Sequence, residues 1–179
     1  MNFKNYFNKM SQLNDKIKWC LNKAQKEINE GKKHRGLLPI TPDINIAREH
    51  INKSQHNLRV TLYLHNGGFT DWCSSSLFYT IYHCFLGILA KYGYESRNQE
   101  CTFAVIENLI GNNEININIE DFKKVISLDV SKNQEKNTAI NLRENSQYST
   151  KTSLKDTEYK KLLNLAKKIL DDTKIIIEE

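Results

Sequence analysis

The sequence is poor in the residues that interrupt helices. Its 179 residues include only two prolines and seven glycines, and scarce breakers suit helices better than a turn-rich β-sandwich. The N-terminal stretch lacks an apolar core of signal-peptide length, and the longest strongly apolar stretch, residues 77–90, is too short to cross a bilayer. We therefore expect a soluble protein of the cytoplasm that makes no contact with a membrane.

Spacings typical of metal sites are also missing. The chain has four cysteines and no CxxC pair among them. Its five histidines show no HExxH or similar ligand spacing. We expect no metal and no cofactor, and we expect all four cysteines to be reduced thiols that lie mostly in the core.

Positive charge is concentrated at the N-terminus. Residues 1–35 contain nine Lys and Arg against three Asp and Glu, a net charge of +6, whereas the remainder has 17 against 18, a net charge of −1. This segment, with Lys32, Lys33 and Arg35 at its end, could bind phosphates electrostatically. A solvated helix face is the other interpretation, and the sequence leaves both open.

Most of the chain has apolar residues at helical spacings of three and four. The alternation of Ile115, Ile117 and Ile119 could instead form a short strand, but the helical spacing resumes directly afterwards. The polar segment SKNQEKNTA should be a loop, and LLPITPD should link an N-terminal segment, 1–43, to a bundle, 44–179. Helices are predicted over residues 11–30, 43–65, 70–92, 98–110, 119–129 and 137–147 and from 153 onward.

Side chains that cap helices support several of these starts. Asp43 should cap the second helix, and Thr70 or Asp71 the third. Ser96 or Asn98 should cap the fourth, and Ser153 with Asp156 resembles a capping box for the last helix. Long helices joined by short turns predict an all-α, antiparallel up-and-down bundle with an additional N-terminal helix.

Four segments of the chain together form a recognisable pattern. They are the helix at 50–58, Asp71-Trp72-Cys73 with Phe78-Tyr79-Thr80-Ile81-Tyr82-His83, the turn at 91–98, and Leu142-Arg143-Glu144-Asn145-Ser146-Gln147-Tyr148. In this order they resemble the HEPN family of helical bundles, over about residues 44 to 175 and excluding residues 1–43. The resemblance implies an antiparallel bundle that acts as a homodimer, often in defence or toxin–antitoxin systems and often with a nucleotidyltransferase partner.

Catalytic members of that family pair an arginine with a histidine that follows a few residues later. Arg143 matches the arginine, but Tyr148 stands where the histidine is expected, and no histidine follows His83. A phenol with a pKa near 10 is a poor base at neutral pH. His83 could replace the missing base, because helical spacing places Tyr79 and His83 on one face of the central helix.

The residues therefore permit more than one function. The preferred hypothesis is a HEPN-like dimeric module, non-catalytic or weakly catalytic, that binds RNA, a nucleotide or a partner protein. The alternatives are a metal-independent ribonuclease that uses Arg143 with His83 or Tyr148, and a structural adaptor for a nucleotidyltransferase. Residues proposed to contact nucleic acid are Tyr79, Arg97, Asn98, Lys53, Arg59, Lys32, Lys33 and Arg35.

Overall fold

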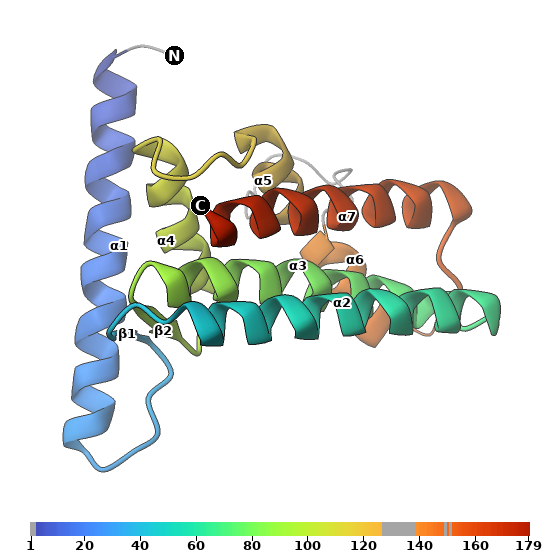
Figure 1. The fold of residues 1–179 in the computed structure, drawn as a ribbon, viewed down its shortest axis with the longest axis horizontal. Helices are drawn as coiled ribbons and strands as arrows, with labels where there is room; N and C mark the ends of the chain where they lie inside the picture. The colour runs from blue at the N-terminus through green and yellow to red at the C-terminus, as the bar shows by residue number, and fades with distance from the viewer. Residues whose placement is uncertain (1–2, 127–138, 149, 151) are drawn as a thin grey trace.

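The computed structural model describes residues 3–126, 139–148, 150 and 152–179. Within them the regular secondary structure is helical apart from one two-stranded ribbon, which confirms the predicted all-α helical bundle (Figure 1). The predicted polar loop SKNQEKNTA and the end of the predicted helix 119–129 lie outside the described residues. The elements are α1 (Phe3–Asn29), β1 (Leu37–Pro39), α2 (Ile44–Asn66), α3 (Thr70–Lys91), β2 (Tyr94–Ser96), α4 (Gln99–Gly111), α5 (Ile119–Ile126), α6 (Ala139–Tyr148) and α7 (Asp156–Glu178).

Helix α3 lies at the centre of the bundle. It packs against α2, α7, α6 and α4, and Figure 1 shows α2, α3 and α7 running side by side. Phe78, Ile81, Phe85 and Ile88 of α3 are fully buried, as expected of a helix that is apolar almost all round. By length and composition α3 could cross a membrane, but 72% of its most apolar window is buried within the fold.

Small residues allow α2 and α3 to approach each other closely. A Cβ atom on Gly87 would lie 3.1 Å from the carbonyl oxygen of Ala47, so the helices touch at this point. Two helical turns further on, the hydroxyl of buried Ser54 donates a hydrogen bond of 2.8 Å to the carbonyl of Thr80. These contacts fix the separation of the two helices along their shared length.

The segment predicted to be a linker contains strand β1. It pairs antiparallel with β2, with Leu37 opposite Ser96 and Pro39 opposite Tyr94. Gly93, just before β2, has a φ of +81°, which suits glycine, and its carbonyl accepts a hydrogen bond from Ile40. The ribbon holds the chain after α1 against the end of α3.

A disulfide between Cys20 and Cys101 joins α1 to α4, with 5.8 Å between the two Cα atoms. The prediction of four reduced thiols was therefore wrong for this pair. The two cysteines are separated by 81 positions, so spacing along the sequence could not reveal that α1 packs on α4. Cys73 and Cys84 are buried free thiols, as expected.

Side-chain caps were predicted for four helices, and the structure confirms those of α2 and α4. Asp43 caps α2 by accepting hydrogen bonds from the amides of Asn45 and Ile46, and Asn98 caps α4 by accepting one from Cys101. The cap predictions for α3 and α7 were wrong, because no side chain makes a capping hydrogen bond at either start. The Thr70 hydroxyl instead accepts a hydrogen bond from the amide of Leu154, a long-range contact.

The alternating isoleucines before α5 do not form a strand. Ile115 and Ile117 are both buried, but they lie in irregular chain that leads into α5. Their alternation reflects the packing of this chain onto the core, and the helix begins at Ile119, as predicted.

Candidate functional site

Arg143 packs against the centre of the bundle. Helix α6 lies beside α3, and the Arg143 guanidinium lies over the ring of Phe78, 4.7 Å from its centroid. Its side chain is 11% exposed and pairs with Glu144 at 3.2 Å. The buried Nε atom has no hydrogen-bond partner. The Arg143 segment and the aromatic segment of α3 are thus neighbours, as the sequence suggested, but this arginine is largely closed off from solvent.

His83 faces a different side of α3. Five residues separate it from Phe78, which corresponds to about 140° around the helix. On that side the Nδ1 atom of His83 lies 3.0 Å from the Nδ1 atom of His50 in α2. Tyr148, at the end of α6, is 84% exposed. The three residues expected for catalysis are therefore not gathered around one point.

The contact between His50 and His83 requires one ring nitrogen to donate and the other to accept. Burial, followed by the charges of His50 and Lys53, lowers the pKa of His83 to about 4. Burial also lowers the pKa of His50, against the opposing effect of Glu49. Both rings are then neutral at neutral pH, so neither is a protonated general acid.

Lys53 and Tyr79 lie on the same face as the histidine pair. Lys53 follows His50 by one helical turn, and Tyr79 precedes His83 by one turn. Lys53 is exposed, and Tyr79 is 40% exposed. Arg59 is also exposed, but it points about 120° away from Lys53 around α2. Two of the predicted nucleic-acid contacts are thus brought together here, and Arg59 is not.

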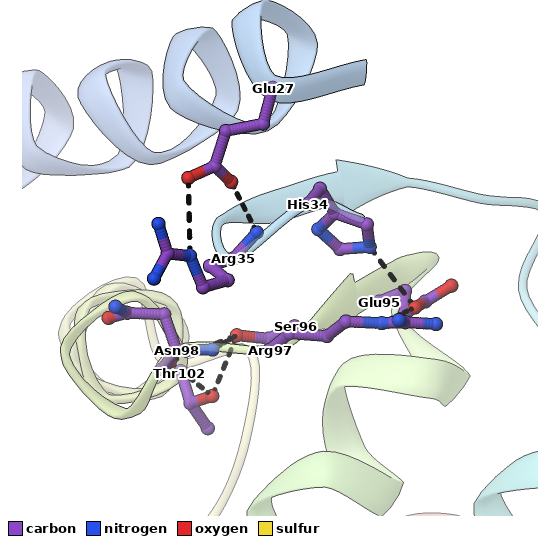
Figure 2. A network of polar contacts seen from close by, with 8 residues as sticks. All are labelled: Glu27, His34, Arg35, Glu95, Ser96, Arg97, Asn98 and Thr102. Atoms are coloured by element: carbon purple, nitrogen blue, oxygen red, sulfur yellow. Dashed lines mark hydrogen bonds and ion pairs between the residues drawn. The ribbon is translucent and has the colours of Figure 1, made fainter. Parts of the chain in front are cut away.

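The other predicted contacts lie where the loop after α1 meets β2, and several are paired with acids. Figure 2 shows Arg35 beside Glu27 and Arg97 beside Glu95; the closest ion-pair distances are 3.5 Å and 2.7 Å. Because these carboxylates neutralise the arginines, the cluster is a weaker phosphate site than its sequence suggested. Lys32 likewise pairs with Glu30, Asn98 serves as the cap of α4, and Lys33 is exposed.

Hydrogen bonds hold the acids of this cluster in the charged form. The pKa of Glu27 is lowered chiefly by a hydrogen bond from the Arg35 backbone amide. Burial tends to raise the pKa of Glu95, but hydrogen bonds from Arg97 and His34 outweigh it and lower the pKa. The network therefore serves to attach the loop after α1 to the ribbon.

A further cationic surface lies on α1 and includes a residue that the sequence reasoning missed. Trp19 is 48% exposed, and the ammonium groups of Lys16 and Lys23 lie 4.7 and 5.1 Å from its ring centroid. Lys26 follows on the same side one turn later. We refer to Lys16, Trp19, Lys23 and Lys26 as the α1 stripe. The spacing of Lys16, Trp19 and Lys23, three and then four residues, was the signal that could have revealed it.

Comparison with known proteins gives no further guide to the site. No protein-family model matches the chain, and no curated protein matches it.

Proposed function

We propose that the protein is a non-catalytic, HEPN-like module that binds single-stranded RNA along the α1 stripe. The observation that carries this proposal is the half-exposed ring of Trp19, with the ammonium groups of Lys16 and Lys23 at 4.7 and 5.1 Å from its centroid. An exposed aromatic ring flanked by cations is the arrangement on which a base can stack while its phosphates are neutralised.

Charge and length favour the same ligand. The stripe belongs to the N-terminal segment, whose net charge is +6 while that of the rest of the chain is −1. From Lys16 to Lys26 the helix rises about 15 Å, enough to follow a few nucleotides of an extended strand. Lys16 also forms a salt bridge with Glu100 of α4, so one of the stripe's three lysines is partly neutralised.

The geometry supports binding over cleavage. RNA cleavage without a metal needs a base near an arginine that can reach the phosphate. The Arg143 guanidinium lies over Phe78 with 11% of its side chain exposed, and His83 faces away from it. The ribonuclease and the nucleotidyltransferase adaptor remain alternatives from the sequence; no contact described above favours either. A role in defence or in a toxin–antitoxin system rests on the HEPN resemblance alone.

The proposal predicts that RNA affinity depends on the Trp19 ring. Replacing Trp19 with Ala should weaken binding of a short fluorescein-labelled single-stranded RNA by about tenfold, the effect of losing one base–aromatic stack. The measurement is fluorescence anisotropy at fixed low salt. Tyr148→Ala is the matched control, because Tyr148 is an aromatic residue 84% exposed on another helix. Equal affinity of the Trp19→Ala variant and the wild type would refute the proposed site.

We also propose that the protein is a homodimer that associates through the turn between α2 and α3. Tyr63, Phe69 and Trp72 are 77%, 56% and 54% exposed there. Residues 60–79 contain one acidic residue and no Lys or Arg, in a chain of which 26% is charged. An exposed aromatic surface almost without charge suits an apolar protein partner better than RNA, and a second copy of the chain is the partner that the HEPN resemblance implies.

The dimer is tested by the mass of the protein in solution. Trp72→Glu should convert a dimer into a monomer in size-exclusion chromatography with light scattering, because a buried, unpaired carboxylate opposes association. Trp19→Ala should leave the mass unchanged, which separates the dimer surface from the RNA stripe. A monomeric wild-type protein at micromolar concentration would rule out this interface.

A further inference from the structure

Two imidazoles from different helices meet at the partly buried contact between α2 and α3. We propose that His50 and His83 form a two-imidazole binding site for a divalent transition metal of the zinc type. The two residues are separated by 33 positions, so the pair could not be predicted from the spacing of ligands in the sequence. This site lies on α2 and α3 and is independent of the RNA stripe on α1.

The distance between the rings suits a shared metal ion. The two Nδ1 atoms are 3.0 Å apart, and the ring centroids are 5.3 Å apart with the planes tilted by 36°. Two nitrogens bound to one tetrahedral zinc at 2.0–2.1 Å lie about 3.4 Å from each other. The ion would lie to one side of the line between the two nitrogens, so both rings must rotate and the nitrogens must separate by about 0.4 Å to admit it.

The backbone around the pair is held in place before any ligand arrives. Gly87 touches Ala47 one turn along from the histidines, and Ser54 hydrogen-bonds to Thr80 on the other side of them. The two imidazoles thus come from helices whose separation is fixed, which lowers the conformational cost of binding.

Both rings are available as ligands at neutral pH. Metal binding requires neutral imidazole, and burial lowers the pKa of both His50 and His83. Without metal, one Nδ1–H donates to the other Nδ1. Coordination by both Nδ1 atoms moves that hydrogen to Nε2 of the same ring, so only the donor histidine changes tautomer and no net proton is released.

The surroundings define the class of metal and its expected affinity. Among the described residues no third histidine, cysteine or carboxylate completes a cluster, so water must fill the two other positions of a tetrahedral ion, one more than in an open zinc site with three protein ligands. The Lys53 charge opposes a cation, whereas the Glu49 charge favours one; both act on the pair. Imidazole ligands select Zn²⁺, Ni²⁺ and Cu²⁺ over Mg²⁺ and Ca²⁺. We expect saturable but moderate affinity.

The test is isothermal titration of the untagged, chelator-treated full chain with ZnCl₂. We expect a stoichiometry of one ion per chain and no heat of binding with MgCl₂. His50→Gln and His83→Gln should each weaken Zn²⁺ binding by about tenfold or more. His56→Gln is the matched control, because His56 is an exposed histidine on the same helix. The proposal is overturned if Zn²⁺ does not bind saturably, or if both variants bind it as the wild type does.

A second measurement covers the case in which the variants fail to fold. In the wild-type protein, Zn²⁺ should shift the imidazole C–H resonances of two of the five histidines in the NMR spectrum. Exposed histidines that bind zinc adventitiously would instead shift together and without saturation. Shifts that spare the partly buried rings of His50 and His83 would overturn the proposal.

Discussion

At the scale of single residues, the histidine pair makes the contact between α2 and α3 sensitive to acid. The folded-state pKa of His83 is about 4 and that of His50 is also lowered, whereas an unfolded histidine titrates near 6.5. Below that value the unfolded chain binds more protons than the folded one. The contribution of the two neutral histidines to the free energy of unfolding is therefore complete above about pH 6.5 and is lost as the pH falls toward 4.

This predicts a measurable loss of stability between pH 7 and pH 5. The free energy of unfolding from urea titration should fall by on the order of 1 kcal/mol, after allowance for the partial exposure of both rings. His83→Gln should remove most of that pH dependence, and His56→Gln should leave it intact. A wild-type protein that is as stable at pH 5 as at pH 7 would contradict the lowered pKa values.

Arg143 illustrates how a motif residue can have a structural role. Its guanidinium stacks on Phe78, and most of its side chain is buried. Arg143→Ala should lower the free energy of unfolding by about 1 kcal/mol through lost stacking and packing, seen as a fall in Tm of about 2–4 °C. RNA affinity should stay the same. Arg59→Ala, at an exposed arginine of α2, is the stability control.

The opposite pattern would return Arg143 to a functional role. If the Arg143→Ala variant keeps the Tm of the wild type but loses RNA binding, the Arg143 side chain contacts the RNA. The motif around Arg143 could be found from the sequence, but the direction of its side chain could not, because that depends on the placement of α6 against α3.

At the scale of secondary-structure elements, the disulfide fixes α1 to the bundle. Cys20 and Cys101 lie within α1 and α4, so the disulfide encloses the whole segment that connects these helices, with a separation of 81 positions. A cross-link over a loop of this length stabilises a folded protein by about 4 kcal/mol in the chain-entropy account. Dithiothreitol should therefore lower the Tm of the wild type, and should have little effect on a variant with Cys20→Ser and Cys101→Ser.

Thiol titration checks the same bond directly. Protein denatured without reductant should expose two free thiols, those of Cys73 and Cys84. Four free thiols would contradict the disulfide and restore the original expectation. The result also bears on location, since disulfides are rare in the cytosol of mesophiles. If protein purified from the cytoplasm has two free thiols, the disulfide and the predicted cytoplasmic location both stand.

Local signals in the sequence predicted most of the elements, and long-range contacts account for the failures. The start of α2 was found because Asp43 acts on amides only two and three residues away. The cap predicted at Thr70 failed because the Thr70 hydroxyl contacts Leu154, which is distant in the sequence. The ribbon was missed because strands of three residues show no alternation that could be recognised.

At the scale of the whole molecule, the candidate sites divide into surfaces of different character. The α1 stripe is cationic and aromatic, and the turn between α2 and α3 is apolar and almost uncharged. The basic N-terminal segment was visible in the sequence, but the half-exposed position of Trp19 was not, since a tryptophan in a helix is more often buried. The pairing of His50 with His83 also required the fold.

Binding and cleavage of RNA can be separated in one experiment. A labelled single-stranded RNA is incubated with the purified protein, its anisotropy is followed, and the same RNA is then examined on a denaturing gel. We expect the anisotropy to rise, by an amount that falls with added salt, and the RNA to be recovered at full length. An unchanged anisotropy at low salt, or RNA shortened by the wild type and spared by the Arg143→Ala variant, would contradict this expectation.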